Sequence, residues 1–216
     1  MIWFYLLSGL FLGWSLGAND AANIFGTAVA TRMVRFKVAA LVASVFVILG
    51  AVISGAGATE TLGELGAVNA LGGSFTVALA AAVTVTWMTR LRLPVSTTQA
   101  IVGAIIGWNF FTGTPTDFDS LTKIFGSWVV SPVLAAAFSL GLYYLARVTI
   151  FRMKVHLLRK DAYNRLALIV IGAFGAYSLG ANNIANVVGV FAPAVPFPDV
   201  SLWFGLTLTG TQQLFL

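Results

Sequence analysis

The chain has 216 residues, of which 59% are hydrophobic and only 9% are charged. Soluble domains carry about 25% charged residues, so this composition excludes a soluble domain and indicates a membrane protein. The apolar runs are continuous rather than alternating, which favours helices over a β-barrel. The net charge of +5 comes from basic residues in short loops, which we interpret as topology signals rather than as a nucleic-acid surface.

In chain order, the apolar runs predict an all-α, polytopic membrane protein with helices over 2–31, 38–57, 71–89, 94–111, 123–146, 166–192 and 201–216. The first run lacks a basic leader and a cleavage pattern, so we expect it to be retained as a span. The run 94–111 is short for a crossing of about 20 residues. Whether it spans the membrane or re-enters from one side is left open.

The loops between these runs alternate in charge. Those at 32–37, 90–92 and 147–165 are basic, whereas those at 58–70 and 112–120 are acidic. Cytoplasmic loops carry an excess of Lys and Arg. We therefore expect a multi-pass protein of the cell membrane, with the three basic loops in the cytoplasm and the acidic loops outside.

A repeat connects the two ends of the chain. The stretch "SLGANDAANIFG" at 15–26 matches "SLGANNIANVVG" at 178–189 with an offset of 163 residues, and eight of the twelve positions are identical. The charges of the flanking loops indicate that the two copies cross the membrane in opposite directions. This is the inverted-topology plan of many transporters. We divide the chain into a first repeat at 1–146, a basic cytoplasmic connector at 147–165, and an incomplete second repeat at 166–216.

The first copy places a carboxylate within the membrane. Asp20 lies about 18 Å along a helix from Arg32, near the middle of a hydrocarbon core about 30 Å thick. Burial there costs about 2.5–3.5 kcal/mol, and an interhelical hydrogen bond returns only about 0.6 kcal/mol. We therefore predict a bound cation at Asp20, with Na⁺ as the metal ion expected. Gly17 and Gly180 predict helix breaks that would free backbone carbonyls for the cation.

The stretch "LPVSTTQAIVG" at 93–103 predicts a helix that begins just after Pro94. Ser96 and Gln99 have the spacing of a capping box. A helix N-terminus with the neighbouring hydroxyl groups also forms an anion site without a basic side chain. The spacing is thus consistent with a structural cap and with an oxyanion site, and the hydroxyl residues concerned are Ser96, Thr97 and Thr98.

Together, "GANDAANIFGTAV", "PVSTTQAIVGAIIG" and "GANNIANVVGVF" resemble the inorganic phosphate transporter (PiT) family, which includes a sulfate permease branch. The resemblance implies symport of inorganic phosphate coupled to Na⁺ or H⁺, with broken helices, no enzyme activity and no further cofactor. It implies oxyanion-binding residues Ser96, Thr97, Thr98, Asn19, Asn182 and Asn186. It implies cation-binding residues Asp20, Asn23 and Asn183.

The chain departs from the family pattern at three points. Gln99 replaces a usual His, and Asn183 replaces a usual Asp. The second counterpart of Pro94 would lie beyond Leu216, so the chain looks truncated in its second repeat. Sulfate transport, a cation channel and a non-transporting membrane scaffold remain alternatives. The expected partners are phosphate or sulfate and membrane lipid, with a homodimer left open and no nucleic acid.

Overall fold

The computed structural model describes residues 2–56, 59, 62, 65, 68, 70–150, 156–194, 200–201 and 207–208. The helices are α1 (Ile2–Ala30), α2 (Phe36–Ser54), α4 (Leu71–Arg90), α5 (Thr97–Thr112), α6 (Phe118–Ile150) and α7 (Leu157–Val188). The predicted all-α class is confirmed. The acidic loop predicted at 58–70 and the last span predicted at 201–216 lie mostly outside the described residues.

Near the end of the chain, two short strands replace part of the last predicted span. Val200–Ser201 forms β1 and Thr207–Leu208 forms β2, and the two pair in antiparallel fashion. The prediction of a helix is wrong for Ser201, Thr207 and Leu208, the three of these residues that lie in that span. Their extended conformation suits the β-branched Val200 and Thr207.

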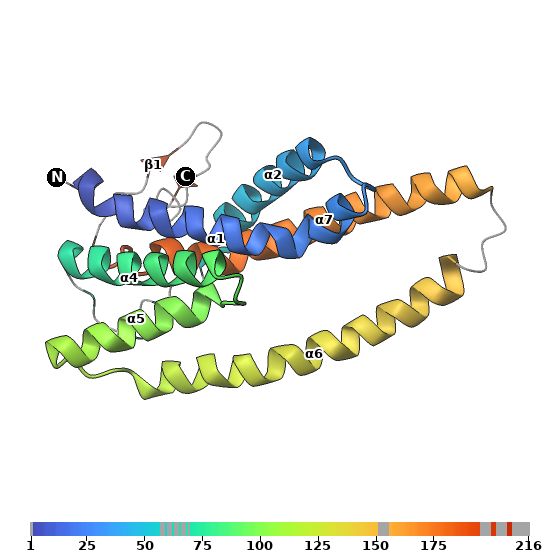
Figure 1. Ribbon diagram of the computed structural model, residues 1–216. Coiled ribbons are helices and arrows are strands. Elements are labelled where there is room, and N and C mark those ends of the chain that lie inside the picture. Colours follow the sequence, from blue (N-terminus) through green and yellow to red (C-terminus); the bar gives the residue numbers. More distant parts are fainter. Residues whose placement is uncertain are drawn as a thin grey trace.

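Successive helices run back and forth, so that α1 and α7 lie antiparallel at the centre (Figure 1). The α4 helix packs along α1, α5 packs on α4, and α2 packs along α7. The α6 helix follows the outside of the bundle (Figure 1), and nearly all of its residues after Trp128 are exposed. The α1–α7 pair therefore joins two groups of helices.

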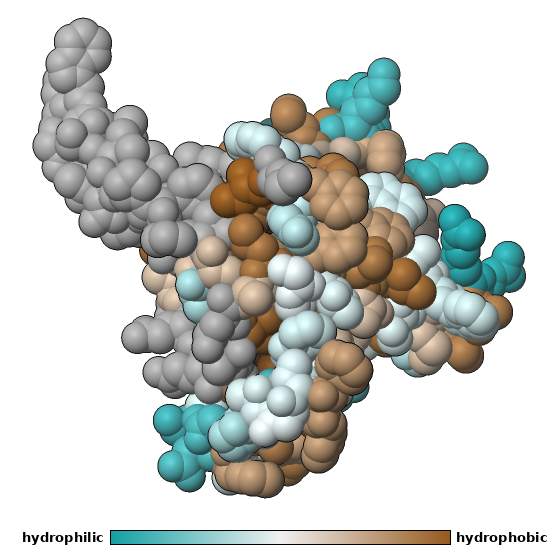
Figure 2. Space-filling model, turned by 90° about the vertical axis from the view of Figure 1, so that its left-hand side faces the viewer, coloured by the Kyte–Doolittle hydropathy of each residue, from teal (hydrophilic) through white to brown (hydrophobic). Residues whose placement is uncertain are grey.

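Four helices within the described ranges are long and apolar enough to cross a membrane, namely α2, α4, α6 and α7. The α5 helix has 16 residues and is about 24 Å long, which is shorter than the hydrocarbon core. In α1, polar residues interrupt the apolar sequence. Figure 2 shows apolar residues over much of the described surface at one end of the bundle, with hydrophilic residues in separate patches.

The α2 and α7 helices approach closely through glycines. A Cβ atom built at Gly180 would overlap the carbonyl oxygen of Val47, and one built at Gly50 would overlap that of Tyr177. Small residues at such crossings allow helix backbones to touch, which is the usual basis of helix packing in membranes. Beside the crossing, the hydroxyl groups of Ser54 on α2 and Tyr177 on α7 form a hydrogen bond of 2.6 Å.

The predicted helix breaks at Gly17 and Gly180 are wrong. Both glycines lie inside continuous helices, α1 and α7. The nearby asparagine side chains hydrogen-bond to groups on other elements and to each other, so they do not compete with the helical backbone. Non-helical backbone occurs instead between α4 and α5, where Val95 and Ser96 lead into Thr97.

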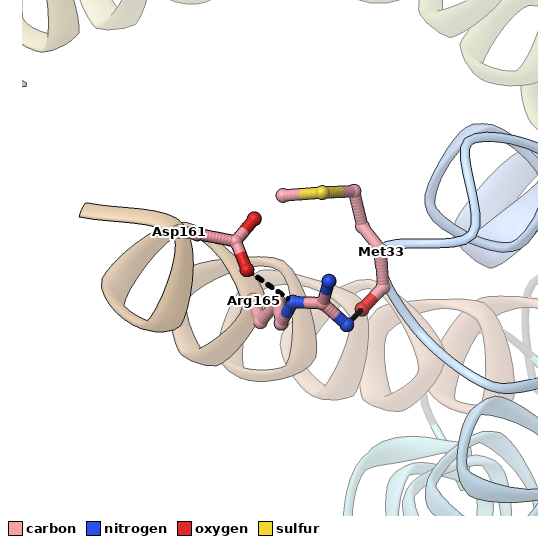
Figure 3. A network of polar contacts seen from close by, with 3 residues as sticks. All are labelled: Met33, Asp161 and Arg165. Carbon is pink, nitrogen blue, oxygen red and sulfur yellow. Dashed lines mark hydrogen bonds and ion pairs between the residues drawn. The ribbon is translucent and has the colours of Figure 1, made fainter. Parts of the chain in front are cut away.

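The connection between α1 and α2 is held by α7. The Arg165 guanidinium donates to the carboxylate of Asp161 at 2.7 Å and to the carbonyl oxygen of Met33 at 3.1 Å (Figure 3). The α7 helix begins at Leu157, so this contact comes from within the predicted basic connector. About half of each side chain in the ion pair is exposed, so the pair positions the connection and adds little stability.

The start of α6 is fixed by Asp117. Its carboxylate accepts hydrogen bonds from the backbone N–H groups of Asp119 and Ser120, each at 3.2 Å. The Ser120 hydroxyl, followed by these two N–H groups, lowers the pKa of Asp117 below its ordinary value of 3.8. These hydrogen bonds therefore stabilise the folded state fully at pH values above the ordinary pKa. That stabilisation is lost as the pH falls through the lowered pKa of the folded state.

Ser74→Ala is expected to destabilise the fold by about 1–2 kcal/mol. The Ser74 hydroxyl is fully buried and donates to the carbonyl oxygen of Val190 at 2.6 Å, which ties α4 to the chain after α7. Thermal unfolding in detergent would measure the loss. Thr76→Ala is the matched control, because the Thr76 hydroxyl is exposed and bonds only within α4. Equal effects of the two substitutions would contradict the role given to Ser74.

Candidate functional site

Asp20 is buried at the centre of the bundle and is held by neutral donors. The Asn19 amide donates to one carboxylate oxygen at 2.7 Å. The Thr97 hydroxyl and the Asn183 amide donate to the other at 3.0 and 2.9 Å. The side chain is 9% exposed. The site thus combines one negative charge with amide and hydroxyl groups from α1, α5 and α7.

Asn19 fixes the α4–α5 connection against α1. Its amide nitrogen also donates to the carbonyl oxygen of Val95 at 3.0 Å, and its oxygen accepts from the Thr89 hydroxyl at 3.3 Å. Ser96 then caps α5, since its hydroxyl accepts from the backbone N–H of Gln99 at 3.3 Å. These contacts aim the first turn of α5 at Asp20. The predicted helix start after Pro94 and the N-cap at Ser96 are confirmed.

The α4–α5 connection reaches the depth of Asp20. Asp20 lies about 15 Å along α1 from the end of that helix at Ala30. The connection 31–35 thus continues from the end of α1, whereas the connection 91–96 contacts α1 near Asp20, further along the helix axis. The α4–α5 pair forms a hairpin whose turn lies beside the buried carboxylate.

The Asp20–Asn183 contact joins equivalent positions of the repeat. The two residues are 163 positions apart in the sequence, which is the offset between the two copies. Residues that contact their own repeat mates lie close to the axis that relates the copies. The antiparallel arrangement of α1 and α7 in Figure 1 agrees with the predicted inverted repeat.

A second layer of hydrogen bonds extends from Asn183. The side-chain oxygen of Asn183 accepts from the side-chain amides of Asn182 and Asn186, each at 3.3 Å. The Asn186 amide also donates to the Thr98 hydroxyl at 3.1 Å. Asn183 and Asn186 are 8% and 2% exposed. A continuous polar chain therefore runs from Asp20 to the second residue of α5.

Two cavities meet at this polar chain. The larger, of about 800 Å³, is lined by Asp20, Asn23 and Ser178, together with the start of α5. The smaller, of about 190 Å³, is lined by Ser127, Trp128 and Asn186, among others. Thr98 and Asn182 line both cavities. These two side chains form part of the wall between them.

The structure brings together most of the predicted site residues. Eight of the nine lie in the hydrogen-bonded cluster or immediately beside it, namely Asn19, Asp20, Ser96, Thr97, Thr98, Asn182, Asn183 and Asn186. Asn23 is exposed and lies on the wall of the larger cavity. All nine assignments remain predictions.

Sequence reasoning missed three contributors. The Thr89 hydroxyl and the Val95 carbonyl oxygen position Asn19, and no local pattern marks either of them. Ser178 lines the larger cavity. It occupies the first position of the second repeat copy, so the repeat was a usable signal for it.

The model of the phosphate transporter family matches residues 16–211. This chain belongs to the phosphate transporter family. The family is one of transporters and not of enzymes. Membership agrees with the four helices that are able to cross a membrane, and it identifies the chain as an integral membrane protein.

Relatives of this phosphate transporter family member come from distant organisms. A putative phosphate permease of Pyrococcus horikoshii is 32% identical over 181 residues, covering 77% of this chain and 45% of that protein. Sodium-dependent phosphate transporter 1 of Mus musculus is 33% identical over 199 residues, covering 87% and 28%. A putative phosphate permease of Chlamydia trachomatis is 31% identical over 218 residues, covering 94% and 49%. The chain spans less than half the length of each.

A solved structure shares the fold of this family member. A protein described as the sodium-dependent phosphate transporter superposes with a TM-score of 0.73 and 21% identity, covering 99% of this chain and 72% of that one. At this identity the likeness supports the helical arrangement alone.

Proposed function

We propose that this chain carries the binding site of a cation-coupled symporter for inorganic phosphate. The observation that carries the proposal is the Asp20 carboxylate, which is held by neutral donors at the repeat axis and opens onto a cavity of about 800 Å³. Family membership supports phosphate as the substrate. The sodium dependence named for the mouse relative favours Na⁺ as the coupling ion, with H⁺ as the alternative.

The charge of Asp20 explains why a cation would be required. Unit charges 4 Å apart interact by about 4 kcal/mol at an effective dielectric constant of about 20. A phosphate ion near Asp20 is repelled on this scale unless a cation neutralises the carboxylate. Cation and anion then each favour the binding of the other, which is the thermodynamic basis of symport.

The oxyanion would bind at the start of α5. The positive end of a helix dipole and its free N–H groups favour anions. The hydroxyl of Thr98 and the amide of Asn182 line the cavity beside this helix start. These donors are neutral, so they suit phosphate only when the charge of Asp20 is balanced. They also suit sulfate, and the experiment below distinguishes the two anions.

The proposal includes an orientation in the membrane. The basic loops 32–37, 90–92 and 147–165 would lie on the cytoplasmic side by the positive-inside rule. Residues 1–146 would form the first repeat, and 166–216 would begin the second. In this arrangement α1 and α7 cross in opposite directions and present Asp20 and Asn183 to each other.

Uptake into liposomes tests the proposal. Labelled phosphate and sulfate would be supplied under a Na⁺ gradient, a proton gradient or neither, with protein-free liposomes as the control. The expected result is saturable phosphate uptake that depends on one cation gradient and resists excess sulfate. Uptake blocked by sulfate but not by unlabelled phosphate would make the chain a sulfate permease. Non-saturable cation flux without anion uptake would favour a channel, and no flux of any kind would favour a scaffold.

A further inference from the structure

Asn183 hydrogen-bonds both to the Asp20 carboxylate and to the amides of Asn182 and Asn186. The nitrogen of its side-chain amide donates to Asp20 at 2.9 Å. The oxygen of the same amide accepts from Asn182 and Asn186 at 3.3 Å. A carboxylate accepts hydrogen bonds and donates none, so an Asn183 side chain facing a bare Asp20 must present its nitrogen there. Its oxygen is then committed to the other two amides.

A cation at Asp20 would reverse this preference. The amide nitrogen carries partial positive charge, whereas the amide oxygen is a good ligand for hard cations. Rotation of the Asn183 amide by about 180° would present its oxygen to the cation. The same rotation removes the acceptor shared by Asn182 and Asn186.

Release of these two amides would create anion-binding groups. Asn182 lines both cavities, and Asn186 lines the smaller one beside Thr98. Once free of Asn183, the buried Asn186 amide keeps its bond to Thr98 but needs an acceptor for its second N–H, because a buried donor is costly when unpaired. The exposed Asn182 amide becomes free to turn toward the cavities that it lines. Oxyanion oxygens supply such acceptors. The two donors would thus become available when the cation is present.

We propose that Asn183 is a positioning residue that couples cation binding to oxyanion binding by turning its side-chain amide. The inference rests on the proposed function of the site. It assigns Asn183 a role beyond that of a ligand, since the residue also controls the donors offered to the anion. An aspartate could not take this role, because both of its side-chain oxygens are acceptors.

Binding to the purified protein in detergent tests the inference. Labelled phosphate binding would be measured with Na⁺ and with a bulky organic cation in its place, and labelled Na⁺ binding with and without phosphate. A parallel series would vary pH for the proton. In the wild type, each ion is expected to raise the affinity for the other by the same factor, typically about 5- to 150-fold. The reciprocal factor measures the coupling directly.

Asn183→Leu keeps the size of the side chain and removes both polar ends. It is expected to bind both ions still, with a coupling factor clearly below that of the wild type, because only the charge of Asp20 would then link the two ions. Asn183→Ala provides a second variant in case the first does not fold. Asn164→Leu is the matched control, since Asn164 lies on the same helix near its start, and it should keep the wild-type factor.

Three outcomes would overturn the inference. Wild-type coupling in both Asn183 variants would exclude the relay and leave the symport proposal intact. Weaker Na⁺ binding with an unchanged coupling factor in both variants would make Asn183 a cation ligand alone. Failure of the wild type to bind phosphate with any cation would overturn the proposed function and the inference with it.

Discussion

Asp20→Asn is expected to abolish cation-dependent phosphate uptake. The substitution removes the negative charge at the centre of the site, where it faces only neutral partners. A contact between unit charges is worth about 4 kcal/mol at an effective dielectric constant of about 20, so cation affinity should fall by a factor of 100 or more. Uptake into liposomes with and without the cation gradient would measure the effect.

The variant should still fold. An amide has the shape of the carboxylate, and its oxygen can accept from Thr97 and Asn183 while the amide of Asn19 turns to suit its nitrogen. Asp161→Asn is the matched control, because it removes the same charge at an exposed ion pair with Arg165. Unchanged cation dependence in Asp20→Asn, with normal thermal stability, would refute the role given to Asp20.

Gly180→Ala is expected to destabilise the described bundle strongly. The added Cβ would overlap the carbonyl oxygen of Val47, and a backbone atom cannot move aside as a flexible side chain can. Overpacking typically costs 1–3 kcal/mol and occasionally more. Separation of α2 from α7 would also loosen the α7 segment that carries Asn183. Thermal unfolding in detergent would report the loss.

The repeat itself supplies the control for this prediction. Gly17 is the equivalent position in the first copy, and within the described residues no atom lies within 4 Å of a Cβ built there. Gly17→Ala should therefore leave the unfolding temperature unchanged or raise it, since alanine favours helix. Similar losses from the two substitutions would show that the close α2–α7 crossing does not carry the stability assigned to it.

The sequence predicted the existence of the six described helices well because apolar residues dominate most of each one. It also predicted the equivalence of Asp20 and Asn183 through the repeat. That the two side chains contact each other could not be read from the repeat, because an offset gives equivalence and not distance. The contact depends on α1 and α7 crossing at these residues, which is a property of packing.

The errors have local causes. Glycine lowers helix stability, but Gly17 and Gly180 lie among residues whose helical hydrogen bonds continue on both sides. The break occurs instead before Thr97, where Pro94 restricts the preceding backbone. The assignment of Asn23 is not among these errors and stays a prediction, since this residue lies on the wall of the larger cavity.

The position of the Asp20–Asn183 pair on the repeat axis has an evolutionary consequence. A site away from such an axis occurs twice in an inverted repeat, whereas a site on the axis is shared by both copies and occurs once. The two copies of this chain differ at that point by one side-chain group, Asp20 in the first and Asn183 in the second. Asparagine and aspartate codons differ by a single base. One point mutation at position 183 would therefore double the formal negative charge of the central pair, and with it the demand for cations or protons.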